Sequence, residues 1–347
     1  MKSLGVAVAV ACALSTLAAA PQWESQTSGV TSRLRGVSAV SDRVAWASGA
    51  GGTIVRTAAG GATWQTLTVP GAETLDFRDI DAVSEQIAYA LSIGPGASSR
   101  IYKTVDAGKS WDLQFTNTDP DAFFDAMAFW DAERGIAFSD SVGGRFVIQS
   151  TRDGGSSWER VPAVGLPTAL ENEGAFAASG TNVAVFGTDH VWIGTGAAAT
   201  ARVLRSTDGG RTWTVAATPL RAGPSAGIFS VAFRDAQHGI VVGGDYKVED
   251  GAIDNAAITS DGGQTWTPVQ GLSGFRSVVA YVPGAPTPTL LAVGPSGADW
   301  SADDGRTWTR VEGAGFHTFS FARNGRLGWG AGENGRIARI DGSTIAR

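Results

Sequence analysis

Short apolar runs broken by glycine recur along the whole chain. One run, Val44–Gly49, is followed after three small residues by Thr53–Arg56, and the same arrangement returns as Gly328–Gly332 followed by Arg336–Arg339. Apolar alternation over a few residues is typical of β-strands, and glycine-rich breaks are typical of the turns between them. Because the chain carries no long helical period, the pattern predicts an all-β protein made of repeated units.

An eight-residue box, Ser/Thr-x-Asp-x-Gly-x-Thr/Ser-Trp, sets the length of the repeat. Five copies follow the pattern, at Thr104–Trp111, Thr151–Trp158, Ser206–Trp213, Thr259–Trp266 and Ser301–Trp308. A sixth copy, Thr57–Trp64, has Ala59 in place of the aspartate. Neighbouring closing tryptophans stand 42 to 55 residues apart. That spacing is typical of the blades of a β-propeller.

The residue types in the box predict a hairpin turn. An aspartate carboxylate accepts hydrogen bonds from turn N–H groups, and glycine supplies a positive φ. The tryptophan offers a large ring for packing between neighbouring sheets. The alternative, a calcium loop, lacks the ligand spacing of an EF-hand. We therefore interpret the boxes as structural.

The box resembles the Asp-box (BNR) repeat of sialidases, xyloglucanases and the photosystem II stability/assembly factor family. The resemblance implies a β-propeller in which each box lies between the third and fourth strands of a blade. Six boxed units and the unboxed unit around Gly328–Arg339 give seven blades, with six or eight as the alternative. The Trp-led segment Gln22–Gln26 matches a missing fourth strand, so we expect the N-terminal strand to pair into the last blade and close the ring. We expect residues 21–347 to form a single β-propeller domain.

The first twenty residues predict export. Lys2, an apolar run over Leu4–Leu17 and the small residues up to Ala20 have the order of a signal peptide, and the run is too short to span a membrane. Cys12, the only cysteine, lies inside this segment. We expect a periplasmic or extracellular protein, without disulfides or a transmembrane segment, and a monomer. The net charge of −6 and the lack of a basic run argue against nucleic-acid binding.

A third repeated element opens each unit and predicts the functional face. Its copies include Leu34-Arg35-Gly36-Val37, Phe77-Arg78-Asp79-Ile80 and Phe275-Arg276-Ser277-Val278. If these are the innermost strands, their starts converge at the mouth of the channel, opposite the boxes. The predicted ring is Arg35, Arg78, Asp125, Glu173, Phe229, Arg276 and His317, with Glu173 taken from the fourth unit, where Glu171–Phe176 replaces the usual opening. Loops reaching the same face add Asp140, Asp245, Tyr246 and Lys247.

Three arginines at one mouth fit a carboxylate, sulfate or phosphate ligand. The alternative is a structural network in which they pair with Asp125, Glu173 and Asp79. The three histidines, His190, His238 and His317, are scattered without ligand spacing, so we expect no metal site. No Walker loop, nucleophile elbow or dinucleotide fingerprint is present, and we expect no cofactor.

Two functions remain open from the sequence. Resemblance to the photosystem II stability/assembly factors implies a noncatalytic propeller that binds a partner polypeptide, here at the channel mouth with a protein or an anionic ligand. The alternative is a sialidase-like glycoside hydrolase acting on acidic sugars, with Asp125 or Glu173 as acid/base, or with Tyr281 as nucleophile beside Glu173. The Phe/Tyr-Arg-Ile-Pro motif of sialidases is missing, since Phe77–Ile80 and Phe275–Val278 lack the proline.

Overall fold

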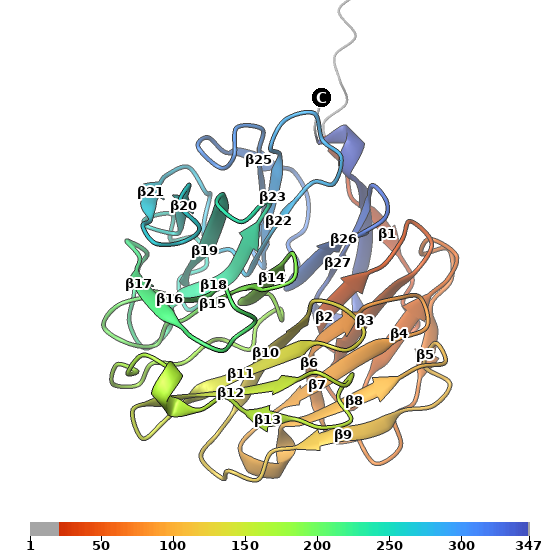
Figure 1. The fold of residues 1–347 in the computed structure, drawn as a ribbon. Helices are drawn as coiled ribbons and strands as arrows, with labels where there is room; N and C mark the ends of the chain where they lie inside the picture. The colour runs from red at the N-terminus through yellow and green to blue at the C-terminus, as the bar shows by residue number, and fades with distance from the viewer. Residues whose placement is uncertain (1–20, 346–347) are drawn as a thin grey trace, which may run out of the picture.

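The computed structural model describes residues 21–345, which form seven four-stranded antiparallel sheets set around a common axis (Figure 1). The signal peptide expected over residues 1–20, with Cys12, lies outside the described residues. The all-β, seven-bladed architecture is confirmed. Within residues 21–345 no helix is long and apolar enough to cross a membrane.

Each blade runs outward from an inner strand near the axis. Blades 1 and 2 are β2 (Leu34–Ala39), β3 (Ala45–Gly49), β4 (Ile54–Thr57), β5 (Gln65–Leu67), and β6 (Asp76–Ala82), β7 (Ala88–Ile93), β8 (Arg100–Thr104), β9 (Asp112–Thr116). Blades 3 and 4 are β10 (Phe124–Phe129), β11 (Gly135–Val142), β12 (Arg145–Thr151), β13 (Glu159–Arg160), and β14 (Val183–Phe186), β15 (His190–Gly194), β16 (Arg202–Ser206), β17 (Thr214–Ala217).

The remaining blades follow the same order. Blades 5 and 6 are β18 (Ala226–Phe233), β19 (Gly239–Asp245), β20 (Ala256–Thr259), β21 (Thr267–Val269), and β22 (Val278–Tyr281), β23 (Leu290–Gly294), β24 (Gly297–Ser301), β25 (Thr309–Val311). Blade 7 is β26 (Thr318–Phe321), β27 (Leu327–Ala331), β28 (Ile337–Asp341) and β1 (Glu24–Gln26). Four short 3-10 turns, η1 (Gly96–Ser98), η2 (Ala163–Gly165), η3 (Glu333–Gly335) and η4 (Gly342–Thr344), lie outside the sheets.

The N-terminal strand closes the ring, as predicted. Strand β1 pairs antiparallel with β28 through Glu24 opposite Arg339 and Gln26 opposite Ile337, and Figure 1 shows β1 beside the strands of the last blade. The Trp23 ring packs against Phe316 with centroids 4.6 Å apart. Because β1 covers the outer edge of β28, the seventh sheet has four strands, like each of the other six.

Each box forms the turn between the third and fourth strands of its blade. In Ser206–Trp213, the Asp208 carboxylate accepts hydrogen bonds from the Arg211 and Thr212 N–H groups, both at 2.9 Å, and from the Thr212 hydroxyl at 2.6 Å. The Ser206 hydroxyl accepts from the Gly210 N–H at 3.0 Å, and Gly210 has a φ of 81°. The box is therefore a self-bonded hairpin turn, in agreement with the sequence.

Aromatic side chains on the second strands fill the space between blades. Trp192 in β15 is fully buried, stacks on Phe233 of blade 5 with centroids 3.6 Å apart, and donates its Nε1–H to the Gly262 carbonyl in the blade 5 box. Tyr89 in β7 stacks on Phe129 of blade 3 at 3.7 Å and donates its hydroxyl to the Gly154 carbonyl in the blade 3 box. The box turns thus fix neighbouring blades to each other as well as shaping their own hairpins.

The box aspartates make stability depend on acidity. Hydrogen bonds from Thr212 and Ser206 outweigh the effect of partial burial and lower the pKa of Asp208 to about 2 from 3.8. A group whose pKa falls on folding stabilises the fold above its unfolded pKa, and that contribution is lost as the pH drops through the folded pKa. The stability from this turn is therefore complete above about pH 5 and disappears between about pH 4 and 2.

Replacing Asp208 with asparagine tests this dependence. At pH 7 we expect the free energy of unfolding to fall by about 1 kcal/mol, because charge-assisted hydrogen bonds in a partly exposed turn are screened by water. In urea unfolding, the difference between Asp208→Asn and wild type should shrink as the pH falls from 4 to 2.5. A difference that stays constant over this range would contradict the assignment of the low pKa to the turn.

Candidate functional site

The antiparallel order of the strands defines two ends of the propeller. The inner strands begin, and the second and third strands connect, at one end, which we call the mouth face. The boxes and the turns between first and second strands lie at the other end, the box face. The sequence prediction that the unit openings lie opposite the boxes is therefore confirmed by the topology.

The predicted ring positions coincide with β-bulges. The register of the inner strand against the second strand shifts at Arg35 in β2, at Arg78 in β6, at Asp125 in β10 and at Phe229 in β18. A bulge leaves one residue unpaired and redirects its side chain, and such bulges are over-represented beside functional sites. Four blades thus use the same irregularity to set the direction of one side chain each at the mouth face.

A segment of blade 4 fills the middle of the channel. Residues 176–181, which we call the plug, precede β14 and contact inner strands of blades on the far side. The Ala177 carbonyl accepts a hydrogen bond from Arg78 at 3.0 Å, the Ser179 hydroxyl donates to the Ser277 carbonyl at 2.8 Å, and the Ser179 carbonyl accepts from Thr318 at 3.2 Å. Blade 4 therefore reaches blades 2, 6 and 7 across the axis.

The plug divides the channel into two cavities. The mouth pocket, of about 310 Å³, has Phe176, Ala177 and Ala178 of the plug in its lining. The bore, of about 410 Å³, opens toward the box face and includes Ser179, Gly180 and Thr181 in its lining. The mouth pocket is completed by Arg35, Arg78, Phe229, Tyr246, Glu249, Phe275, Ser277, Pro295 and His317.

One half of the mouth pocket is basic. Arg78 donates from Nε to Asp76 at 2.9 Å, and His317 Nε2 lies 2.7 Å from the Glu333 carboxylate. Among residues 21–345, no carboxylate or other acceptor bonds the guanidinium of Arg35, whose Nε is buried without a partner. Burial, followed by repulsion from Arg78, lowers the pKa of Arg35 to about 10. Arg35 therefore remains charged at neutral pH. The carboxylates of Glu333 and Asp76 are near enough to favour this charge, but neither forms an ion pair with Arg35 in the described chain.

His317 beside it is neutral at physiological pH. Burial and the charge of Arg35 lower its pKa to about 4, although the hydrogen bond to Glu333 opposes this shift. Because a carboxylate only accepts, the proton of the neutral ring lies on Nε2. The positive charge of this half therefore comes from the arginines.

The other half of the mouth pocket is aromatic. Phe176 of the plug stacks on Phe229 with centroids 4.1 Å apart and planes within 3° of parallel, and Phe275 meets Phe229 edge-on at 4.6 Å. Tyr246, in the loop between β19 and β20, lies 6.0 Å from Phe176 and is 45% exposed. Glu249, the acidic residue of the lining, is exposed on the same loop and forms no ion pair with a described residue.

Glu173 does not reach the mouth pocket. Its carboxylate is fully buried and pairs with Arg202, accepts from the Thr195 hydroxyl at 2.7 Å and from the Leu170 N–H at 2.8 Å. The alignment of Glu171–Phe176 with the other unit openings placed it in the ring, but inner strand β14 begins only at Val183. The intervening residues form the plug instead.

Arg276 also has partners inside the protein. Its side chain is fully buried, with Nε 2.7 Å from the Asp299 carboxylate and a further hydrogen bond to the Phe275 carbonyl at 2.7 Å. Asp245 lies 3.7 Å from Arg221. The sequence offered a structural network as the alternative, in which the three mouth arginines pair with Asp125, Glu173 and Asp79. In the described residues none of these ion pairs forms.

Asp125 lies beneath the surface next to Asp140. Its side chain is 1% exposed, and burial followed by the neighbouring Asp140 raises its pKa well above the ordinary value. Burial raises the pKa of Asp140 to about 6, and its carboxylate accepts from the Ala175 N–H at 3.0 Å. Burial therefore favours the protonated form of Asp125, and the Asp140 carboxylate anchors the backbone just before the plug.

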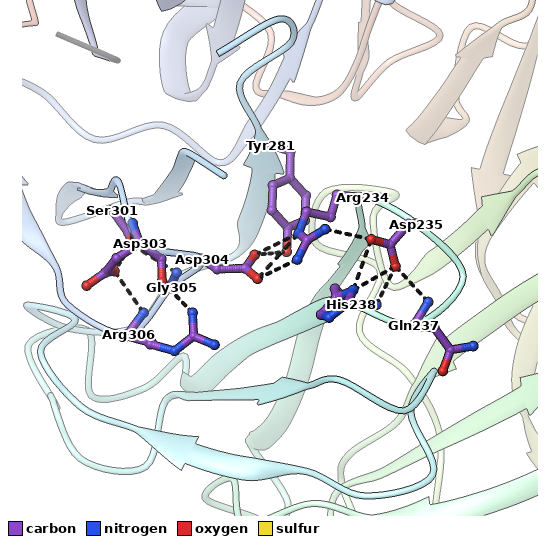
Figure 2. Close-up of polar contacts among 10 residues, drawn as sticks. All are labelled: Arg234, Asp235, Gln237, His238, Tyr281, Ser301, Asp303, Asp304, Gly305 and Arg306. Carbon is purple, nitrogen blue, oxygen red and sulfur yellow. Dashed lines mark hydrogen bonds and ion pairs between the residues drawn. The ribbon is translucent and has the colours of Figure 1, made fainter. Parts of the chain in front are cut away.

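Tyr281 belongs to the box face. At the end of β22 it lines the bore, and its hydroxyl donates to Asp304 at 2.8 Å, where Arg234 also binds at 3.0 Å; Figure 2 shows the two side chains meeting the Asp304 carboxylate. Burial, followed by Asp304, raises the pKa of Tyr281 well above its usual range. Tyr281 and Glu173 therefore lie toward different ends of the channel and do not form a nucleophile–base pair.

The site that the structure assembles is a pocket at the mouth of a plugged propeller, with Arg35, Arg78 and His317 on one side and Phe229 and Tyr246 on the other. Within the described part of the chain, no three His, Cys, Asp or Glu side chains group as metal ligands would. The fold and the site together define the class: a seven-bladed β-propeller with a basic and aromatic mouth pocket.

Solved structures share this fold. YCF48 bound to D1 peptide superimposes with a TM-score of 0.65 at 16% identity, over 92% of this chain and 96% of that one. YCF48 from Cyanidioschyzon merolae gives a TM-score of 0.65 at 17% identity over 94% and 100% of the two chains. The resemblance to photosystem II assembly factors is thus confirmed for the fold.

A glycoside hydrolase shares the fold as well. The GH74 xyloglucanase from Xanthomonas campestris has a TM-score of 0.63 at 16% identity, covering 93% of this chain but 54% of the enzyme. The chain thus spans about half the length of that enzyme. No protein-family model and no curated protein sequence matches the chain.

Proposed function

We propose that this protein is an exported, noncatalytic β-propeller that binds a partner protein or an anionic ligand at its mouth face. The observation that carries the proposal is Arg35, a partly buried cation that lines a cavity of about 310 Å³ and has no counter-charge in contact among residues 21–345. A cation in a pocket without a bonded carboxylate favours an anion from outside, most strongly a carboxylate or phosphate that can accept two of its N–H groups.

The similar fold of YCF48 bound to D1 peptide supports a polypeptide partner, because that propeller is a peptide-binding protein. The signal-peptide pattern of residues 1–20 supports the periplasm or the extracellular space as the place where binding occurs.

The alternative is a glycoside hydrolase, which the similarity to the GH74 enzyme supports. Its candidate residues fit poorly, because Asp125 and Glu173 are buried and Glu173 is neutralised by Arg202. A glycosidase needs one carboxylic acid and one carboxylate facing the same cleft. A screen of fluorogenic uronides, sialosides and xyloglucan oligosaccharides should therefore show no turnover. Turnover lost in a folded Asp125→Asn or Glu173→Gln variant would favour the enzyme.

The location of the partner tests the proposal. A photo-cross-linking benzoylphenylalanine is placed at Tyr246 on the mouth face or, as a matched control, at Val105, which is 56% exposed in a box turn. Expressed in the source organism, the Tyr246 variant should cross-link a defined partner and the Val105 variant should not. Equal cross-linking at both positions would contradict binding at the mouth face.

A further inference from the structure

We propose that the mouth pocket recognises a polypeptide segment carrying an acidic side chain next to an aromatic one, with the carboxylate on Arg35 and the ring against the aromatic wall. The aromatic wall is Phe176, Phe229, Phe275 and Tyr246. This inference rests on the proposed function and specifies its ligand.

The two halves of the pocket need different chemistry from one ligand. Arg35 projects from a β-bulge and is flanked by Arg78, whose Nε is already taken by Asp76 and whose Nη1 is taken by the plug. Arg35 is thus the arginine of this pocket that still lacks an acceptor. In the opposite half, Phe229 and Phe275 are buried beneath Phe176, and the accessible rings are Phe176 and the 45% exposed Tyr246. These two rings can bind an aromatic side chain through stacked and edge-on contacts.

The plug shows how a peptide sits in this pocket. Phe176 lays its ring flat on Phe229, and the next residue, Ala177, gives its carbonyl to Arg78. One aromatic side chain and an adjacent oxygen therefore already bridge the aromatic and basic halves. A bound segment with its ring against Phe176 and Tyr246, and with a carboxylate in place of the carbonyl, would give Arg35 the bonded counter-charge that it lacks.

The surroundings favour a polypeptide with few charges. The loop after β19 extends the aromatic wall outward with exposed apolar side chains, Tyr246 at 45%, Val248 at 47% and Ile253 at 68% exposure. An extended chain leaving the pocket would cover these residues, and their burial would add to its affinity. Glu249 on the same loop repels a polyanion, and the pocket volume, near the lower end for ligand sites, suits one or two side chains.

Short peptides with blocked ends test the ligand class on residues 21–347. Four peptides place Asp-Phe, Asn-Phe, Asp-Ser or Lys-Phe in the same Gly-Ser context. Each has an amidated C-terminus and, at the end of a long Gly-Ser spacer, an uncharged fluorophore without a carboxyl group, so the aspartate side chain is the only carboxylate. Fluorescence anisotropy should give the lowest Kd for Asp-Phe. Asn-Phe and Asp-Ser should bind about tenfold more weakly or worse, because each lacks one of the two groups, and Lys-Phe should not bind measurably.

A variant and its control test whether the aromatic half of the pocket binds the aromatic side chain of the peptide. Tyr246→Ala, a change at an exposed position, should weaken Asp-Phe binding at least about threefold while leaving Asp-Ser unchanged. Val105→Ala on the box face is the matched control and should alter neither. Thermal unfolding confirms that each variant is folded.

Equal binding of Asp-Phe and Asn-Phe, or binding of Lys-Phe, would overturn the acidic–aromatic ligand. If no peptide binds while a partner still cross-links at Tyr246, the ligand class is wrong and the mouth-face function stands. If Asp-Phe binds equally well to wild type and to Tyr246→Ala, the aromatic half is assigned wrongly.

Discussion

Replacing Arg276 with methionine should lower the free energy of unfolding by about 3 to 5 kcal/mol. The guanidinium is fully buried and bonds the Asp299 carboxylate, the Phe275 carbonyl and the hydroxyls of Ser273 and Ser296. Methionine fills a similar volume but leaves Asp299, which is 1% exposed, as an uncompensated buried charge. Chemical denaturation at pH 7 measures the loss.

A paired substitution separates the charge from the packing. In Arg276→Met combined with Asp299→Leu, both charges are gone, and most of the lost stability should return because apolar replacements of a buried ion pair are often neutral. Arg306→Gln, at an exposed position in a box turn, should stay within about 0.5 kcal/mol of wild type. A loss below 1 kcal/mol in Arg276→Met would contradict a structural role and return Arg276 to the list of candidate ligand residues.

Replacing Arg35 with glutamine should weaken peptide binding and leave the free energy of unfolding nearly unchanged, in contrast to Arg276→Met. We expect the affinity for the Asp-Phe peptide to fall at least about tenfold, because the carboxylate loses its charged partner in a partly buried site. The free energy of unfolding should remain within about 1 kcal/mol of wild type or rise, because Arg35 is desolvated beside Arg78 and Arg33 with no carboxylate in contact. Anisotropy titration and chemical denaturation of the same sample measure both quantities.

The binding loss should also depend on salt. Raising the ionic strength from 0.05 to 0.5 M should weaken wild-type binding and change that of Arg35→Gln much less, because only the former includes the ion pair. Arg306→Gln is the control for nonspecific charge. If Arg35→Gln binds the peptide as wild type does, or if it loses stability as Arg276→Met does, then Arg35 is a structural residue.

The contrast between these two arginines shows what the sequence could predict. Both occupy the second position of a repeated opening, so the repeat places them in one ring. The two arginines differ in their bonding partners. Asp299, 23 residues after Arg276, forms an ion pair with it, while no carboxylate forms an ion pair with Arg35 in the described residues. A repeat aligns positions, but it does not show which of them find partners from other strands.

The boxes made most of the fold predictable. Within eight positions, each complete box contains the glycine of the turn, the hydroxyl and aspartate side chains that accept the turn N–H groups, and the tryptophan that leads into the next strand. The turn between the third and fourth strands of a blade therefore follows from one motif. The closing strand was predictable from Trp23, which has the position of a box tryptophan without its box. The site residues Arg35, Arg78, Phe229 and His317 followed from the register that the boxes set, and Tyr246 followed from the loop between the second and third strands. The structure brings these five to one pocket.

The sequence did not predict the plug, nor that Phe176 and Phe275 line the mouth pocket. The fourth unit lacks the usual opening, and its run of small residues, Ala177-Ala178-Ser179-Gly180, was the one available signal of a different role. Gly180 has a φ of 76°, and a Cβ there would come within 2.2 Å of Asp79. Such a close approach between blades depends on the assembled ring, so the order of residues in the unit does not reveal it.

A crystal structure of residues 21–347 with the Asp-Phe peptide tests the central claim most directly. The mouth pocket should contain the peptide, with both carboxylate oxygens within hydrogen-bond distance of the Arg35 guanidinium and the phenyl ring against Tyr246 or Phe176, the accessible rings of the aromatic wall. A peptide bound at the box face, or one in the pocket with its carboxylate away from Arg35, would contradict the account.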